Sequence, residues 1–399
     1  MWIFLSFLML ITSILLTIKI NFKNFKIIKM LKTLLKDKTA LFLSLGTKIG
    51  VGSIIGTTAS IIIGGPSGVI WMFIFSILTS SLIYAESYLG IKYREKTKDG
   101  HIGGSYYILK NGLNKKRLAI ISLLLLLIIY SFLFQMVQSN TIAHSIELTM
   151  NINKNIIFVI FIIILSITLS LNIKELLNTM NKIVPFMCIL FIIIALLAIT
   201  KNIKILLPSL KLLFSNITSV KSFFAGAIIG IKRSVFMNET LIGTTSLSAS
   251  IDRNDKKTAI NIQVLGTYII TFIIGLLITL MISIYLYKYD ITSNYLELII
   301  NVFNSLIGNI GVYILIIIFI LFGTTTILSG YYIGKSNLEH LTNKKLIIHI
   351  FKLLFITFTL GGIFINTSLL WKIIDSFMYI MIIINIYSII RLGDKSDWK

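Results

Sequence analysis

The feature that most constrains this chain is a series of apolar runs long enough to cross a membrane. A helix that spans the hydrocarbon core of a bilayer needs about 20 apolar residues. We count eleven such runs, at residues 2–19, 39–63, 67–92, 118–147, 155–172, 182–200, 222–250, 258–287, 309–335, 346–366 and 369–391. Only 13% of the residues are charged, against about a quarter in soluble domains. The sequence therefore predicts an all-α integral membrane protein with eleven transmembrane helices, the first retained rather than removed as a signal peptide.

The basic residues between the apolar runs predict the orientation. If residues 20–38 face the cytoplasm, the inside loops and ends carry 26 Lys and Arg residues and the outside loops carry 6. Cytoplasmic loops of membrane proteins are enriched in these residues, so we expect an external N-terminus and a cytoplasmic C-terminus in the cell membrane. The same bias accounts for the net charge of +22, and no nucleic-acid partner is expected.

Residues 20–38 form a basic segment with an amphipathic pattern. Such segments lie along the inner membrane surface, where anionic lipids attract lysine. A contact with membrane lipids is therefore expected here. The alternative is an ordinary solvated loop.

Two of the apolar runs, 39–63 and 222–250, differ from the rest because they carry glycine and polar residues at mid-depth. Each opens a group of five predicted helices, and five is odd, so the second group enters from the opposite side of the membrane. Inverted repeats whose first helix is broken have this arrangement. We therefore expect an extra helix and basic segment at 1–38, a first repeat at 39–200, and a second repeat at 201–399 that includes a short cytoplasmic C-terminus.

In the run 39–63, Gly50 and Gly52 allow the helix to open, because glycine tolerates backbone angles that other residues avoid. An opened helix presents N–H groups that bind a carboxylate and carbonyl groups that bind Na⁺. The alternative is close helix packing, which small residues also permit. Lys48 lies beside this opening, about 13 Å from the start of the run. It could face a cavity and substitute for a cation, paired with Glu86, Glu239 or a carbonyl, or it could extend to the membrane surface.

The run 222–250 contains Lys232, Arg233, Asn238 and Glu239. Charged groups inside a membrane usually mark a transport pathway or an internal ion pair. The alternative is two shorter segments joined by a loop.

Two further runs carry polar residues at membrane depth. Gln138 could donate to a carboxylate, or it could bond a neighbouring helix. Thr324, Thr325 and Thr326 offer hydroxyl oxygens to Na⁺, or each could bond its own helix.

At these places the chain resembles the alanine/glycine:cation symporter family, also called sodium:alanine symporters. The stretch GVGSIIGTTASIIIGGPSGVIWM resembles that family's G-T-G-N-I-x-G-V…G-G-P-G-x-x-F-W-M signature. VQSNTIA, GIKRSVFMNETLIGTTS and LFGTTTILSGYYIGKSNLEHL resemble three later motifs, in the same order as in the family. Departures fall on expected ligands: serine replaces the family's asparagine at Ser53, and Thr240 and Leu241 replace Ala-Gly.

The resemblance implies a leucine-transporter-type fold of five plus five helices and Na⁺-coupled uptake of small neutral amino acids by alternating access, with no other cofactor. It assigns eleven residues to the substrate: Thr47, Gly50, Gly52, Ser53, Gly56, Gln138, Phe236, Asn238, Glu239, Gly243 and Trp371. It implies a Na⁺ site at Thr47, Gly50, Thr324, Thr325 and Thr326. Proton-coupled or uncoupled transport, or a sensor or channel on the same scaffold, stays open as an alternative. No nucleophile–base pair or nucleotide-binding loop in the sequence indicates an enzyme.

Overall fold

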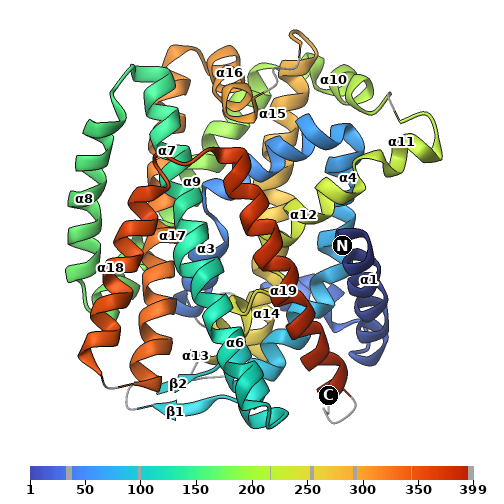
Figure 1. Ribbon diagram of the computed structural model, residues 1–399. Helices are drawn as coiled ribbons and strands as arrows, with labels where there is room; N and C mark the ends of the chain where they lie inside the picture. The colour runs from blue at the N-terminus through green and yellow to red at the C-terminus, as the bar shows by residue number, and fades with distance from the viewer. Residues whose placement is uncertain are drawn as a thin grey trace.

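The computed structural model describes residues 1–32, 38–97, 100–215, 217–251, 256–290, 294–342 and 344–393 (Figure 1). The fold is a bundle of helices with one small two-stranded hairpin. Within the described residues, seven helices are long and apolar enough to cross a membrane, or eight if one bent pair is counted as a single span. The prediction of an all-helical, multi-span membrane protein is therefore confirmed.

The elements of the N-terminal half are as follows. They are α1 (Trp2–Lys19), η1 (Lys23–Phe25), α2 (Ile27–Leu31), α3 (Lys38–Lys48), α4 (Val51–Lys92), β1 (Glu95–Thr97), β2 (Gly100–Ile102), α5 (Ser105–Tyr107), η3 (Ile108–Gly112), α6 (Lys116–Leu126), η4 (Leu127–Leu133), α7 (Phe134–Met150), α8 (Lys154–Ser170) and α9 (Ile173–Lys201).

The C-terminal half continues with helices alone in its described part. They are α10 (Ile203–Ser215), α11 (Val220–Ala225), α12 (Ala227–Asn238), α13 (Thr244–Ile251), α14 (Lys256–Ile269), η5 (Ile270–Gly275), α15 (Leu276–Leu286), α16 (Tyr295–Ile307), α17 (Asn309–Leu341), α18 (Lys345–Gly361) and α19 (Thr367–Gly393).

Helix α4 turns back on itself at Gly65. As one straight rod its 42 residues would be about 63 Å long, twice the hydrocarbon thickness of a bilayer. Gly65 has φ 61° and ψ −162°, which is not helical, and Pro66 follows it. The Thr57 hydroxyl lies 3.9 Å from the Met72 sulfur, although 15 residues of unbroken helix would separate them by about 22 Å. The two limbs therefore lie side by side and divide where the predicted runs 39–63 and 67–92 divide.

The helix breaks predicted in the runs 39–63 and 222–250 are both present. Helix α3 ends at Lys48 and α4 begins at Val51, with Gly50 extended between them. Helix α12 ends at Asn238 and α13 begins at Thr244, and the intervening Glu239, Leu241 and Gly243 all have positive φ. A further break at Gly226 separates α11 from α12. The run 222–250 is thus a broken helix.

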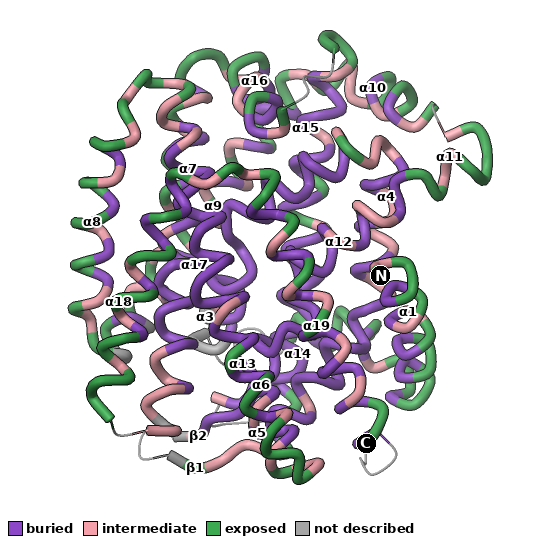
Figure 2. Tube along the Cα trace, viewed as in Figure 1, coloured by how far each residue is buried: buried purple, intermediate pink, exposed green. Residues whose placement is uncertain are grey.

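The buried core lies around α3, α4, α12 and α17, and the outer helices expose apolar side chains (Figure 2). Helix α8 stands at the edge of the bundle with Ile156, Val159 and Ile163 exposed. Helix α1 exposes Phe4 and Phe7 in the same way. Apolar surface of this kind on outer helices is what lipid contact requires.

Several short elements were not predicted from the sequence. Helices α10 and α16 have 13 residues each, and the hairpin of β1 and β2 pairs Glu95 with Ile102. In the basic segment 20–38 the described residues form η1, α2 and the first residue of α3, and residues 33–37 lie outside the described part. The expected contact of this segment with membrane lipids stays a prediction.

Candidate functional site

A cavity lies where the two broken helices meet in the centre of the bundle. The cavity is narrow in this conformation, with a volume of about 10 Å³, which is room for about one water molecule. Its lining residues are Thr47, Lys48, Gly50, Gly52, Ser53, Phe134, Gln138, Phe236, Glu239 and Thr326. The cavity thus brings together most of the residues expected at the substrate, one expected Na⁺ hydroxyl and Lys48.

One wall of the cavity is the N-terminal end of α4. The first N–H groups of a helix have no partner within it and carry partial positive charge. Here the N–H of Val51 donates to Gln138 Oε1 at 3.0 Å, and Gln138 Nε2 donates to the Phe134 carbonyl at 3.2 Å. Ser53 Oγ donates to the Gly50 carbonyl at 2.6 Å. The glutamine from α7 therefore occupies the position that an anion would take at this helix end.

The opposite wall is the C-terminal end of α12, where carbonyl groups lack helical partners. Lys48 Nζ donates to the Asn238 carbonyl at 2.7 Å, and the Lys48 residue is only 4% exposed. The lysine therefore does not extend to the membrane surface. Its positive charge lies at the negative end of a helix dipole, where a bound cation would also be stabilised.

Two buried carboxylates hold the unwound stretch between α12 and α13. Glu86, on the second limb of α4, accepts from the Leu241 N–H at 3.0 Å and from the Gly243 N–H at 2.9 Å. Glu239 accepts from the Thr244 hydroxyl at 2.6 Å and also lines the cavity. The Leu241 and Gly243 N–H groups that the break exposes are thus satisfied by the Glu86 carboxylate.

The side chain of Asn238 does not line the cavity. Its Nδ2 donates to Ser76 Oγ at 2.7 Å, and its Oδ1 accepts from Thr271 Oγ1 at 3.2 Å. These bonds fix the end of α12 against α4 and η5. Asn238 reaches the site only through the carbonyl that Lys48 contacts.

Aromatic rings cover the cavity on the α19 side. Phe236 lies between Phe134, at 4.4 Å between ring centroids, and Trp371, at 4.6 Å. A Cβ on Gly52 would collide with the Phe236 ring, so glycine at 52 allows that ring its place. Trp371 therefore contacts a lining residue rather than the cavity itself.

An ion cluster lies beyond these rings. The Arg233 guanidinium stacks on the Trp371 ring at 3.9 Å. Asp375 Oδ2 lies 3.3 Å from Arg233 Nη2 and 3.0 Å from Lys232 Nζ. The cluster joins α12 to α19 and gives the charges predicted in the run 222–250 an internal partner. Gly56 lies beside Arg233 and is not part of the cavity lining.

The three threonines of α17 do not lie together at the cavity. Thr326 lines it and donates to the Phe322 carbonyl at 3.1 Å. Thr325 donates to the same carbonyl at 2.9 Å and contacts the Met187 sulfur. Thr324 is half-buried and does not line the cavity.

The carbonyls at the end of α3 already have partners. Tyr130 OH donates to the Thr47 carbonyl at 3.1 Å, and Ser329 Oγ donates to the Gly46 carbonyl at 3.4 Å. Neither residue was predicted from the sequence. Their hydroxyls tie the first half of the broken helix to η4 and α17.

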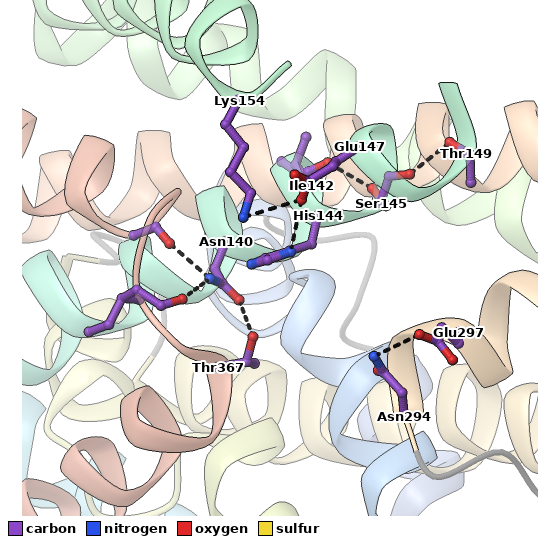
Figure 3. A network of polar contacts seen from close by, with 12 residues as sticks. Asn140, Ile142, His144, Ser145, Glu147, Thr149, Lys154, Asn294, Glu297 and Thr367 are labelled. Carbon is purple, nitrogen blue, oxygen red and sulfur yellow. Dashed lines mark hydrogen bonds and ion pairs between the residues drawn. The ribbon is translucent and has the colours of Figure 1, made fainter. Parts of the chain in front are cut away.

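Asn140, near Gln138 on α7, connects helices and does not line the cavity (Figure 3). Its Nδ2 donates to the Gly362 and Ile365 carbonyls at 2.8 and 2.9 Å, and its Oδ1 accepts from Thr367 Oγ1 at 2.8 Å. In the same view Glu147 accepts from Lys154 at 3.2 Å. Asn140 therefore joins α7 to the segment between α18 and α19 and to the start of α19.

Two residues of this region were not predicted, although the sequence contains a signal for each. Phe134 lies one helical turn before Gln138, on the same face. Asp375 is an acidic residue inside the apolar run 369–391, and the rule that drew attention to Lys232 and Arg233 applies to it equally.

Comparison with known proteins identifies the family. The model of the sodium:alanine symporter family matches residues 1–396. The amino-acid carrier protein AlsT of Bacillus subtilis is 24% identical over 411 residues, covering 98% of this chain and 88% of that protein. The sodium/alanine symporter AgcS of Methanococcus maripaludis is 26% identical over 372 residues, covering 89% and 81%.

A solved structure supports the fold. The crystal structure of a manganese transporter from Eremococcus coleocola matches with a TM-score of 0.51 and 13% identity, covering 89% of this chain and 77% of that one. At this identity the likeness concerns the fold alone. The family match extends over nearly the whole chain, and the protein therefore belongs to the sodium:alanine symporter family.

Proposed function

We propose that this protein is a secondary transporter that carries small neutral amino acids together with Na⁺ by alternating access. The observation that carries the proposal is the central cavity, which has the N-terminal end of α4 on one side and the C-terminal end of α12 on the other. The first attracts a carboxylate and the second a cation. An amino acid and a sodium ion together supply both charges.

We further propose eleven membrane crossings in a leucine-transporter-type fold, with repeats at 39–200 and 201–399, an external N-terminus and a cytoplasmic C-terminus. The two broken helices, α3–α4 and α12–α13, open these repeats. Because α4 folds back at Gly65, its two limbs cross the membrane twice in this proposal, although α4 counts as one long helix. The likeness to the manganese transporter supports the same architecture.

In the proposed binding step, the substrate carboxylate takes the Val51 N–H from Gln138. The Gln138 amide then turns its N–H₂ group toward the carboxylate, and Glu239 faces the substrate ammonium from the opposite wall. The rings of Phe134 and Phe236 restrict the space left for a side chain. This arrangement favours a small neutral amino acid.

For the sodium ion we propose oxygen ligands from Thr47, Gly50 and the hydroxyl of Thr326. A Cβ added at Gly50 would lie 2.5 Å from Thr326 Oγ1, so hydroxyl and backbone are close. Thr324 and Thr325 are farther from the cavity lining and are weaker candidates.

One contact favours a second candidate, transport without Na⁺. Lys48 Nζ already lies on the Asn238 carbonyl, at the helix end where a coupling cation would be stabilised. A fixed ammonium there can substitute for one ion. Coupling would then depend on protons, or be absent.

Purified protein in liposomes distinguishes the candidates. An inward Na⁺ gradient is expected to drive accumulation of labelled alanine above the level reached in K⁺ alone. Accumulation that ignores Na⁺ but follows a pH gradient supports the second candidate. If the liposomes take up none of the small neutral amino acids under either gradient, both candidates fail.

A further inference from the structure

A second cavity lies away from the central one, against the basic segment that follows α1. Its volume is about 60 Å³. Its lining residues are Lys23, Lys26, Lys29, Met30, Tyr84, Lys257 and Asn261. Two walls thus meet here, one from η1 and α2 and the other from α4 and α14.

The basic segment is held firmly against the body of the protein. Asn24 is fully buried, and its Nδ2 donates to Ser80 Oγ at 2.9 Å. The Tyr268 hydroxyl, on α14, donates to the Asn24 carbonyl at 3.0 Å. The lysines on either side of Asn24 are therefore positioned by the fold, in contrast to those of a solvated loop.

Lysines make up most of the described lining of this cavity. Lys26 and Lys29 are exposed there, and an anion bound in the cavity is attracted by their ammonium groups. The lysine ammonium, the Tyr84 hydroxyl and the Asn261 amide all offer hydrogen-bond donors, which suits the oxygens of a phosphate group.

The surroundings of the cavity are apolar. On the same segment Phe22, Phe25, Ile28 and Leu31 are exposed, with Ile28 at 76%. The neighbouring helix α1 exposes Ile11, Ile14, Leu15 and Ile18 along its outer face. A ligand that fits both surfaces has an anionic head and long apolar chains.

We propose that this cavity binds the phosphate headgroup of an anionic phospholipid, whose acyl chains lie along α1. With the predicted orientation, the lipid belongs to the inner leaflet. The site is separate from the transport cavity and does not depend on what that cavity carries. It anchors the basic segment to the membrane surface.

The test compares two double variants that remove equal charge. Lys26→Gln with Lys29→Gln alters the cavity, and Lys115→Gln with Lys116→Gln alters exposed lysines of another loop on the same predicted side. Phosphatidylglycerol or phosphatidylcholine is titrated into detergent-purified full-length protein, and the apparent affinity is read from the rise in melting temperature. Inorganic phosphate and glycerol phosphate are titrated in parallel.

The wild type is expected to be stabilised by phosphatidylglycerol and not by phosphatidylcholine. The cavity variant is expected to lose about 25-fold in apparent affinity, since each lysine near an anionic surface contributes about fivefold, and the control variant is expected to keep its affinity. Equal stabilisation by the two lipids, or an equal loss in both variants, overturns the proposal. Stabilisation by inorganic phosphate as strong as that by phosphatidylglycerol overturns the assignment to lipid. If the cavity variant does not fold, Lys26→Gln alone, with an expected loss of about fivefold, replaces it.

Discussion

The ion cluster above the cavity allows a quantitative prediction for Asp375→Asn. Asp375 neutralises one of two cations, and the side chains of Arg233 and Asp375 are only 6% and 11% exposed. At 3.3 Å and an effective dielectric constant of about 20, the attraction between them is about 5 kcal/mol. Desolvation of both groups offsets part of this energy. Removing one partner of a buried pair nevertheless costs about 3–5 kcal/mol, because the other charge stays buried.

The expected result is a lower melting temperature. With an unfolding entropy of about 2.1 cal/mol/K per residue, a loss of about 3 kcal/mol lowers the melting temperature of this chain by about 4 °C. Thermal unfolding of the purified variant in detergent measures the change. Glu339→Gln is the matched control, because Glu339 is 38% exposed and lies 3.9 Å from Lys335, and an exposed pair contributes at most about 1 kcal/mol.

A double variant tests the cause. In Arg233→Met with Asp375→Asn, the unpaired buried guanidinium is absent, so the melting temperature is expected to recover part of the loss. The reasoning is refuted if Asp375→Asn melts like the control. It is also refuted if the double variant is less stable than either single variant. Uptake should fall as well, since the cluster holds Trp371 against Phe236 at the edge of the cavity.

Three further predictions concern the broken helices. Gly52→Leu is expected to abolish uptake while the protein still inserts into the membrane, because any side chain at 52 collides with Phe236. Gly361→Leu is the control, since a Cβ there meets no atom within 4 Å. Normal uptake by Gly52→Leu contradicts the proposed site. Lys48→Met is expected to change the dependence of uptake on Na⁺, and unchanged dependence at normal expression removes the lysine from the coupling scheme. Glu86→Gln leaves one carbonyl oxygen for the N–H groups of Leu241 and Gly243, and it is expected to lower the free energy of unfolding by about 1–3 kcal/mol. A melting temperature equal to that of wild type would show that the carboxylate does not hold the stretch between α12 and α13.

Hydropathy was sufficient to locate the long helices, because the length of an apolar run follows directly from bilayer thickness. Helices α1, α17 and α19 begin within two residues of the predicted starts. It missed α10 and α16, which at 13 residues each are too short to register as membrane spans. The hairpin of β1 and β2 was missed because three-residue strands leave almost no periodic pattern.

The glycines illustrate why a sequence motif alone does not distinguish a glycine that permits close helix packing from one that lies where a helix opens. At Gly226 and Gly230 an added Cβ would collide with the backbone of the Gly64–Gly68 turn, so these glycines permit close helix contact. Gly50 is extended at a helix end, so it belongs to an opening. The opening predicted in the run 39–63 is present at Gly50, whereas the packing role of Gly226 and Gly230 was not predicted and follows from their tertiary contacts.

The same limit applies to polar side chains near the breaks. Asn238 and Gln138 both carry amide side chains that can bind a carboxylate, and the sequence gives no reason to assign them different roles. In the structure Asn238 is engaged by Ser76 and Thr271, whereas Gln138 faces the cavity. Which neighbour satisfies an amide depends on residues far away in the chain, so the local motif around the amide does not predict it.

Gln138 and Lys48 have one property in common that bears on transport. Each satisfies a helix end, Gln138 at the start of α4 and Lys48 at the end of α12. Neither group is fixed by the helix it serves, since Gln138 comes from α7 and Lys48 from α3. In the proposed binding step a substrate carboxylate displaces Gln138 at a small cost, because one hydrogen bond to the Val51 N–H replaces another. Lys48 differs, because moving a buried ammonium away from its carbonyl leaves a buried charge without a partner. The contact of Lys48 with α12 therefore favours the second candidate, in which this ammonium stays in place of a coupling cation.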